Sequence, residues 1–197
     1  MRLVHFITHP EVDVDPAVPV PEWRLSVVGE ARMRRCLAQP WLARVGHLFA
    51  SRERKARDGA RILGAHLGLP WTEDEELGEN DRSATGFLPP DEFQRTADVF
   101  FAHPERSVRG WETARAAQAR VVRAVGRAIA SVQGTASIAI VSHGGVGTLL
   151  LCHLAGAPIT RARDQPGRGG GCVFAFDADT RRVLHDWQTI DEPFPVP

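Results

Sequence analysis

Apolar residues in this chain fall into short continuous runs and into longer stripes with helical spacing. The short runs are rich in β-branched and aromatic residues and predict buried strands at residues 2–7, 45–50 and 138–141. Stripes with apolar positions three or four apart predict helices at about residues 26–37, 51–67, 91–101, 111–132 and 145–155, the first two capped by Ser26 and Ser51. Two alternating segments at residues 172–177 and 181–187 are typical of a hairpin.

This alternation of strands and helices predicts one α/β domain over residues 1–197. The expected architecture is a three-layer sandwich, in which helices flank a mainly parallel central sheet and the hairpin closes the C-terminal end. Residues 161–171, rich in glycine and arginine, are expected to form a mobile connection before that hairpin. A chain of 197 residues is long enough to bury a full hydrophobic core.

Composition excludes several classes of protein. Apolar residues make up 43% of the chain, and no apolar run approaches the roughly 18 residues of a membrane span. Basic and acidic residues balance at 24 each, so overall charge favours neither nucleic acid nor a membrane surface as partner. The cysteines Cys36, Cys152 and Cys172 lack CxxC spacing, which favours reduced thiols in a cytoplasmic protein.

The best-defined chemical motif is the turn Ser142-His143-Gly144-Gly145. It joins an apolar strand to an apolar helix, at the edge of the sheet where open α/β folds bind ligands. The N–H groups at the start of such a helix attract anions. The alternative is that the two glycines only form a tight turn and that His143 is a hydrogen-bonded bystander.

A second histidine occupies an equivalent position. His9 follows the first strand, and Pro10 keeps the chain extended as it leaves that strand. Since parallel neighbours place their carboxyl ends at one edge, we expect His9 and His143 to lie together. By itself, His9 is also compatible with a structural histidine at a strand end.

A pair of separated histidines suits nucleophilic catalysis, in which an imidazole nitrogen accepts a phosphoryl group. Such a site needs cationic donors for the phosphoryl oxygens and an acid for the leaving oxygen. Lys55, the only lysine of the chain, Arg82 and the second histidine could provide the donors, and Glu79 the acid. Neither a metal ion nor a cofactor is expected. Glu79 lies in an acidic stretch and Arg82 has the character of a surface residue, so solvated roles stay open for both.

The chain resembles the histidine phosphatases of the phosphoglycerate-mutase-like superfamily over nearly its whole length. The segments that carry the resemblance are Thr8-His9-Pro10-Glu11, Leu25-Ser26 with Gly29, Ser51 to Ala60, Leu77-Gly78-Glu79, Gly110-Trp111-Glu112-Thr113 with Arg120, and Ile140-Val141-Ser142-His143-Gly144-Gly145. The last of these matches the second histidine motif of the family almost letter for letter.

The resemblance implies a role for each matched residue. His9 would be the nucleophile, His143 a phosphate ligand that stabilises the transition state, and Glu79 the proton donor. Thr8, Lys55 and Gly144 would belong to the phosphate pocket. Arg82 lies outside the matched segments, and we expect it to restore a missing guanidinium in the same pocket. Thr8 and Lys55 replace arginines of the family and Pro10 replaces a glycine, so the pocket loses bidentate donors.

Three functions are therefore open. The leading hypothesis is a metal-independent phosphomonoester hydrolase that forms a phosphohistidine on His9 and acts on a small phosphorylated molecule. The alternative is a catalytically weak or inactive member of the same fold that binds phosphate or another anion. A third reading, a metal hydrolase that uses Glu11, Asp13 or Asp15 with the two histidines, lacks paired ligand spacing on a helix. A homodimer is compatible with the sequence.

Overall fold

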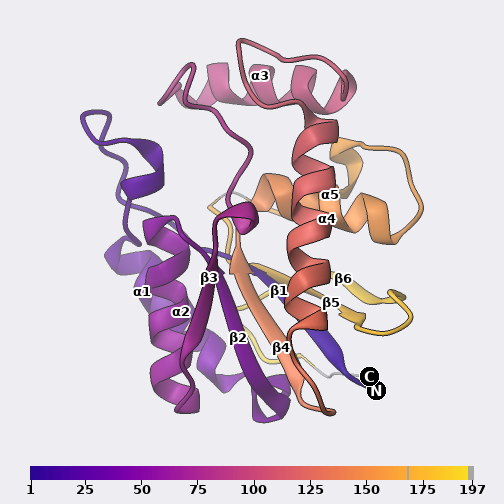
Figure 1. Ribbon diagram of the computed structural model, residues 1–197. Coiled ribbons are helices and arrows are strands. Elements are labelled where there is room, and N and C mark those ends of the chain that lie inside the picture. Colours follow the sequence, from indigo (N-terminus) through magenta and orange to yellow (C-terminus); the bar gives the residue numbers. More distant parts are fainter. Residues whose placement is uncertain (168, 195–197) are drawn as a thin grey trace.

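The computed structural model describes residues 1–167 and 169–194, and a six-stranded sheet forms its centre. The sheet has the order β3-β2-β4-β1-β5-β6 (Figure 1). Its strands are β1 (Leu3–Thr8), β2 (Val45–Ser51), β3 (Trp71–Asp74), β4 (Ser137–Ser142), β5 (Cys172–Asp177) and β6 (Val183–Thr189). Strands β3, β2, β4 and β1 run parallel, whereas β5 pairs antiparallel with both β1 and β6. The predicted hairpin is confirmed.

Helices cover both faces of the sheet, as Figure 1 shows. They are α1 (Val27–Arg35), α2 (Arg54–Leu67), α3 (Pro90–Ala102), α4 (Ala114–Ala130) and α5 (Gly144–Leu154). One apolar core packs α1 and α2 on the sheet, and a second core joins α3, α4 and α5 to the opposite face. The predicted three-layer α/β class is confirmed. None of the helices in the described ranges is long and apolar enough to span a bilayer.

The burial of β4 on both faces explains why its unbroken apolar run predicts a central strand. Ile138 and Ile140 face one core, while Ala139 and Val141 face the other, and all four side chains are fully buried. A parallel strand covered by helices on both faces needs apolar residues at every position. The neighbours of β4 are β1 and β2, so the ends of these three strands meet at one edge.

The start of the second helix was predicted too early. Helix α2 begins at Arg54, and Glu53, not Ser51, occupies the N-cap position. The cap predicted at Ser51 is therefore wrong, whereas Ser26 does cap α1 by accepting from the Gly29 amide at 3.1 Å. The hydroxyl of Ser51 accepts only from the Glu53 amide, which leaves its own proton for another partner.

Two further segments differ in detail from expectation. The acidic stretch after Pro70 contains an edge strand, β3, followed by the short 3-10 helix Glu75–Leu77. Helix α4 starts at Ala114, later than predicted, because the Thr113 side chain accepts from the Ala116 amide and caps it there. The connection at residues 161–171 contains a 3-10 turn at Arg161–Arg163, and Arg168 lies outside the described residues.

Two helical glycines allow a matched test of the packing of α5. A Cβ added to Gly147 would lie 2.8 Å from the Trp187 ring and 2.9 Å from the Phe6 ring, whereas one added to Gly126 in α4 meets nothing within 4 Å. We expect Gly147→Ala to lower the free energy of unfolding by about 1–3 kcal/mol through overpacking. Gly126→Ala should raise it by about 0.5–1 kcal/mol through helix propensity. Urea titrations of both variants measure these changes, and equal effects would contradict the close packing.

Candidate active site

The ends of β1 and β4 hold the two histidines side by side. Their parallel pairing runs to Thr8 and Ser142, the last residues of the two strands. The His9 amide then donates to the Ser142 carbonyl at 3.1 Å. The ring centroids of His9 and His143 are 5.2 Å apart. The expected meeting of the two strand ends is observed.

The backbone carbonyl of the next residue, Pro10, holds the His9 ring in one tautomer. Its Nδ1 lies 2.8 Å from the Pro10 carbonyl oxygen. Because a carbonyl only accepts, Nδ1 carries the proton and Nε2 keeps a free lone pair. Burial, reinforced by the nearby Lys55 ammonium, lowers the pKa of His9 from 6.5 to about 4. Replacing a glycine by Pro10 thus removes a backbone donor but keeps the acceptor that orients His9.

His143 is fully buried and contacts the end of β2. Its Nε2 lies 2.8 Å from the Ser51 hydroxyl and 3.4 Å from Oε1 of Glu53. Burial lowers the pKa of His143 to about 3, against the opposing effect of Glu53, so the ring is neutral at pH 7. Among the described residues, Nδ1 of His143 has no hydrogen-bond partner. A buried polar atom without a partner is what a bound ligand would satisfy.

Glu53 is the main site residue that the sequence did not reveal. Its carboxylate forms a short ion pair with Lys55 and accepts from the Glu79 amide at 2.8 Å. Burial opposes ionisation of Glu53, but the facing His143 ring and Lys55 ammonium hold its pKa well below the usual range. Lys55 also donates to the Val20 carbonyl at 2.9 Å. Lys55 is therefore in the site as predicted, but its ammonium is already engaged.

Glu79 lies over the start of helix α5. The amides of Gly145 and Val146 donate to its two carboxylate oxygens, each at 3.0 Å. This is the usual place for an anion at a helix N-terminus. Only 12% of the Glu79 side chain is exposed. The structure thus places Glu79 beside the histidine turn, at the position from which a proton donor could act.

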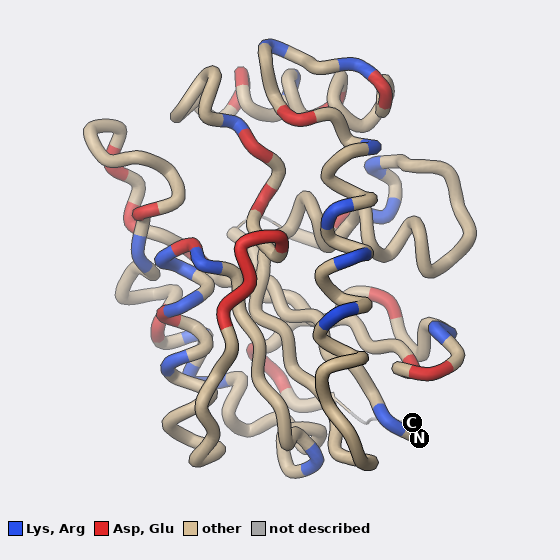
Figure 2. The backbone as a smooth tube through the Cα atoms, viewed as in Figure 1, with Lys and Arg blue, Asp and Glu red and all other residues tan. Residues whose placement is uncertain are grey.

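Arginines of α4 fix the loop that carries Glu79. Arg120 donates to the carbonyls of Glu76, Gly78 and Glu79 at 2.8–3.0 Å. Arg123 and Arg127 pair with Glu76, and Figure 2 shows this row of basic residues beside the acidic stretch that ends β3. The acidic stretch therefore anchors a loop to a helix.

Arg82 approaches the site from the same loop. Its guanidinium is 4.0 Å from the Glu79 carboxylate and lies over the rings of Phe93 and Trp111, at 5.1 and 5.7 Å from their centroids. Only 19% of its side chain is exposed. Arg82 therefore has the fixed, partly buried position of a site residue, although its role as a phosphate ligand stays a prediction.

The Thr8 side chain is engaged on the other side of β1. Its hydroxyl accepts from the Cys172 amide at 2.9 Å and lies 2.7 Å from Oε1 of Gln165. The Gln165 amide nitrogen in turn lies close to Gly144, where an added Cβ would meet it at 2.3 Å. Thr8 thus positions Gln165, a second residue that the sequence did not reveal, beside the histidine turn.

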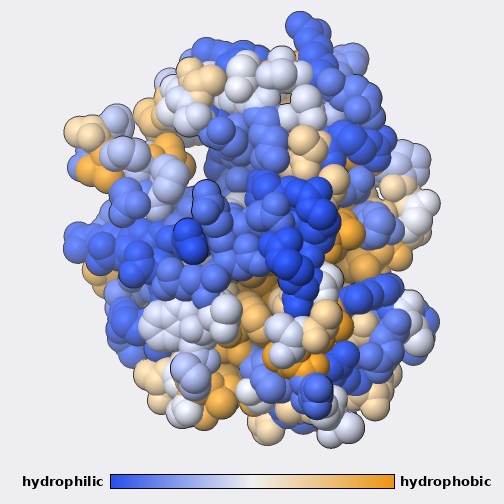
Figure 3. Space-filling model, in the orientation of Figure 1, coloured by the Kyte–Doolittle hydropathy of each residue, from blue (hydrophilic) through white to orange (hydrophobic). Residues whose placement is uncertain are grey.

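A cavity of about 1150 Å³ opens beside Glu53, Glu79 and Arg82. It is lined by Pro19 to Glu22, Ser51 to Glu53, several residues between Glu75 and Gly86, and by Glu112 and Arg120. Figure 3 shows hydrophilic residues across this face and a hollow between the loop at residues 13–22 and the part of the molecule that carries α3. Trp23, which follows that loop, contacts Phe87, with ring centroids 5.9 Å apart. Asn80 Nδ2 lines the same region and has no partner among the described residues.

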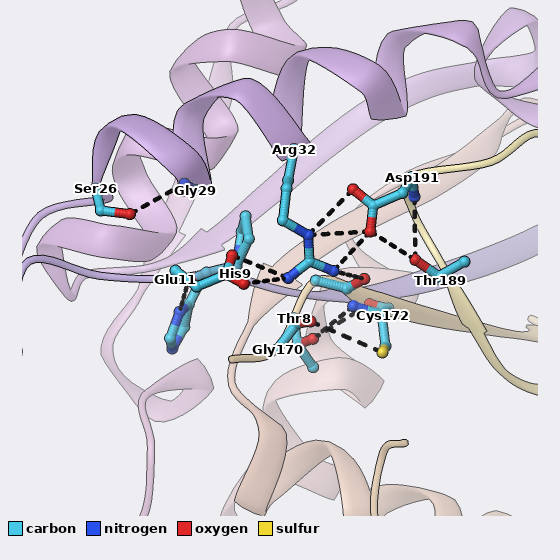
Figure 4. Close-up of polar contacts among 12 residues, drawn as sticks. Thr8, His9, Glu11, Ser26, Gly29, Arg32, Gly170, Cys172, Thr189 and Asp191 are labelled. Carbon is cyan, nitrogen blue, oxygen red and sulfur yellow. Dashed lines mark hydrogen bonds and ion pairs between the residues drawn. The ribbon is translucent and has the colours of Figure 1, made fainter. Parts of the chain in front are cut away.

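Glu11 and Asp13, two of the carboxylates named in the alternative metal reading, have other partners. Arg32 donates to both oxygens of Glu11 at 2.9 Å and also binds Asp191, as Figure 4 shows. Asp13 forms an exposed ion pair with Arg24. Within residues 1–167 and 169–194, no three histidine, cysteine, aspartate or glutamate side chains gather as metal ligands would.

One protein family and several solved structures are similar to this chain. The family described as histidine phosphatase superfamily (branch 1) matches residues 17–188. The structure resembles a mycobacterial glucosyl-3-phosphoglycerate phosphatase in complex with inorganic phosphate, with 18% identity, a TM-score of 0.76, and 98% of this chain and 100% of that chain covered. No curated protein sequence matches the chain.

Two other solved structures are similar. A putative alpha-ribazole-5'-P phosphatase from Escherichia coli has 20% identity and a TM-score of 0.75, with 96% of this chain and 98% of that chain covered. The Bacillus stearothermophilus protein YhfR has 19% identity and a TM-score of 0.75, with 94% and 95% covered. At these identities the likeness establishes the fold.

The position of Arg82 predicts a specific loss of anion binding. We expect Arg82→Ala to weaken binding of inorganic phosphate at pH 6 by about tenfold or more, since a hydrogen bond to a charged group contributes roughly 1.5–3 kcal/mol. Tryptophan fluorescence, to which Trp111 contributes, can follow the titration. Arg123→Ala is the matched control because its guanidinium is exposed and pairs with Glu76. Equal affinities of the Arg82 variant and the unmodified protein would remove Arg82 from the site.

Proposed function

The chain belongs to the histidine phosphatase superfamily, and we propose that it hydrolyses phosphate monoesters through a phosphohistidine on His9, without a metal ion. The family match covers residues 17–188, which confirms the resemblance read from the sequence. It includes His143, Lys55 and Glu79 but begins after His9. The role of His9 therefore depends on geometry.

The observation that supports His9 as nucleophile is the state of its ring. The Pro10 carbonyl fixes the proton on Nδ1, and the low pKa keeps Nε2 unprotonated at neutral pH. A nucleophilic imidazole needs an available lone pair in this form. The same carbonyl stabilises the positive ring that exists while Nε2 carries a phosphoryl group.

In the first step, Nε2 of His9 attacks phosphorus and forms a P–N bond while the bond to the leaving oxygen breaks. The carboxyl group of Glu79 gives its proton to that oxygen, and the alcohol leaves. In the second step, water attacks phosphorus, the P–N bond breaks and Glu79 takes a proton from the water. Inorganic phosphate leaves, and His9 and Glu79 return to their starting states.

The oxygens of the transferring group need fixed donors. We assign these to Lys55, Arg82, His143 and the first backbone group of α5 at Gly144. The unpartnered Nδ1 of His143 supports this assignment, as does the placement of Gly144 at a helix N-terminus. Gln165, held by Thr8, is a further donor at the position nearest Gly144.

The substrate class is a small phosphorylated molecule. The similar structures bear the names of phosphatases that act on a phosphorylated sugar acid and on a phosphorylated riboside, and the cavity of about 1150 Å³ has room for a leaving group of that size. The aromatic contact of Trp23 with Phe87 borders this space. A cytoplasmic location belongs to the same proposal, supported by three buried free thiols.

One observation favours the second candidate, an anion-binding protein with little or no turnover. Glu53 forms an ion pair with the Lys55 ammonium and lies near His143. Two of the proposed phosphate ligands therefore already have an anionic neighbour. Thr8 brings no charge to the pocket. Detection of a phosphoryl enzyme separates the two candidates.

We expect a phosphoryl adduct on His9. The protein is mixed with an aryl phosphate in the presence of a chelator, quenched in alkali and analysed by mass spectrometry. The adduct should be stable in alkali and labile in acid, and should be absent from His9→Ala. His66→Ala is the control, since this histidine is exposed in α2. Turnover that disappears with the chelator would contradict a metal-independent reaction, and binding without adduct or turnover would favour the second candidate.

The acid limb of the rate profile should lie far below the ordinary histidine range. Protonation of Nε2 removes the nucleophile, and because burial and Lys55 lower the pKa of His9 to about 4, the reactive form persists until the pH falls through about 4. Measurement of kcat/KM between pH 3.5 and 7 tests this. Return of samples from pH 4 to pH 7 with full recovery excludes unfolding as the cause. A midpoint near 6.5 would contradict the buried, neutral state of His9.

A further inference from the structure

Glu53 places a negative charge inside the anion pocket. Its side chain is only 15% exposed, and its two oxygens are distributed over the cationic and donor groups of the site. One oxygen pairs with Lys55, and the other accepts from the Glu79 amide and lies 3.4 Å from His143. Lys55 and His143 are two of the groups that we assign to the phosphoryl oxygens, so Glu53 would lie beside the bound group.

Glu53 offsets part of the positive charge of the site. Lys55 of α2 and Arg82 of the neighbouring loop are the cations that lie near it, and Glu79 is the proposed proton donor. The rings of His9, after β1, and His143, after β4, are neutral at pH 7 because burial lowers the pKa of each. The partial positive charge at the N-terminus of α5 is less available to a bound anion, because the amides of Gly145 and Val146 already donate to Glu79.

A doubly charged phosphate would meet this pocket without a matching excess of positive charge. A phosphate monoester carries about two negative charges above its second pKa, near 6, and about one below it. Like charges at close range inside a partly buried site repel strongly because solvent screening is weak. A singly charged phosphoryl group could share Lys55 and Arg82 with Glu53 at less cost.

We propose that Glu53 determines specificity by making the pocket select phosphoryl groups that carry a single negative charge. The inference rests on the proposed phosphoryl-transfer function. Two sources supply such a group: a phosphate monoester in mildly acidic solution, where it is singly protonated, and a phosphodiester, which is singly charged at all pH values above about 2. Glu53 acts by repulsion of the second charge, and Lys55 retains its place beside the bound oxygen.

The decisive variant is Glu53→Gln, which keeps the shape of the side chain and removes its charge. Binding of inorganic phosphate is measured at pH 5 and pH 8 by isothermal titration. The wild-type protein should bind at least tenfold more weakly at pH 8 than at pH 5. In Glu53→Gln this difference should shrink to threefold or less, with tighter binding at pH 8. Glu75→Gln is the control, because this glutamate borders the same cavity but is 82% exposed.

Kinetics identify the source of the singly charged group. With p-nitrophenyl phosphate, kcat/KM of the wild-type protein should fall about tenfold per pH unit above pH 6. In Glu53→Gln this alkaline fall of kcat/KM should begin at a higher pH. Turnover of bis(p-nitrophenyl) phosphate that stays level from pH 6 to pH 8 would identify a diester, and its absence a monoester. Both results support selection of a single charge.

Other outcomes overturn the inference. If Glu53→Gln weakens phosphate binding at both pH values, Glu53 only positions Lys55 and His143. If its alkaline limb coincides with that of wild type, another group sets the charge preference. Absence of turnover and adduct in both proteins would refute the proposed enzyme, but the titrations at pH 5 and pH 8 would still decide whether Glu53 selects the charge of the bound anion. Circular dichroism confirms that each variant is folded.

Discussion

The parallel pairing of β1 with β4 is the constraint on which the rest of the site depends. It joins a strand from the start of the chain to one more than 130 residues later, and it ends at Thr8 opposite Ser142. A shift of one residue would turn every side chain of the strand to the opposite face of the sheet, and the two faces are filled by different cores. The burial of β4 on both faces therefore fixes the relative positions of His9 and His143.

Around His9 and His143, the buried acidic side chains each have a cationic or hydrogen-bonding partner close by. Ionised groups are rarely buried without partners, because the loss of hydration exceeds what a lone charge recovers. Glu53 and Lys55 satisfy this condition for each other, and the amides at the start of α5 donate to both side-chain oxygens of Glu79. These contacts stabilise the folded protein. In the proposed function, a bound anion would have to share the same donor groups. Contacts that stabilise the fold at this site would therefore weaken the binding of an anion.

Sequence patterns predicted the features that depend on local order or on strand ends. The two histidines were placed together because each follows an apolar strand, and Ser142-His143-Gly144-Gly145 has a recognisable spacing. Glu53 and Gln165 could not be found in this way. Glu53 was assigned to a helix interior because the helix start was placed at Ser51, and a residue just before a helix points differently from one inside it. Gln165 reaches the site only through the fold of a connecting loop.

Thr8, Pro10 and Lys55, the residues at which the resemblance implies departures from the family motif, have connected contacts. Thr8 holds Gln165, whose amide nitrogen lies beside Gly144. Lys55 offers a compact charge that pairs with Glu53 over a short distance. Pro10 keeps the one backbone group that His9 requires. If these residues replace two arginines and a glycine, as the resemblance implies, they keep the orientation of His9 and lower the positive charge around it. This combination fits the proposed change in substrate charge better than decay, since decay would not spare the orientation of His9.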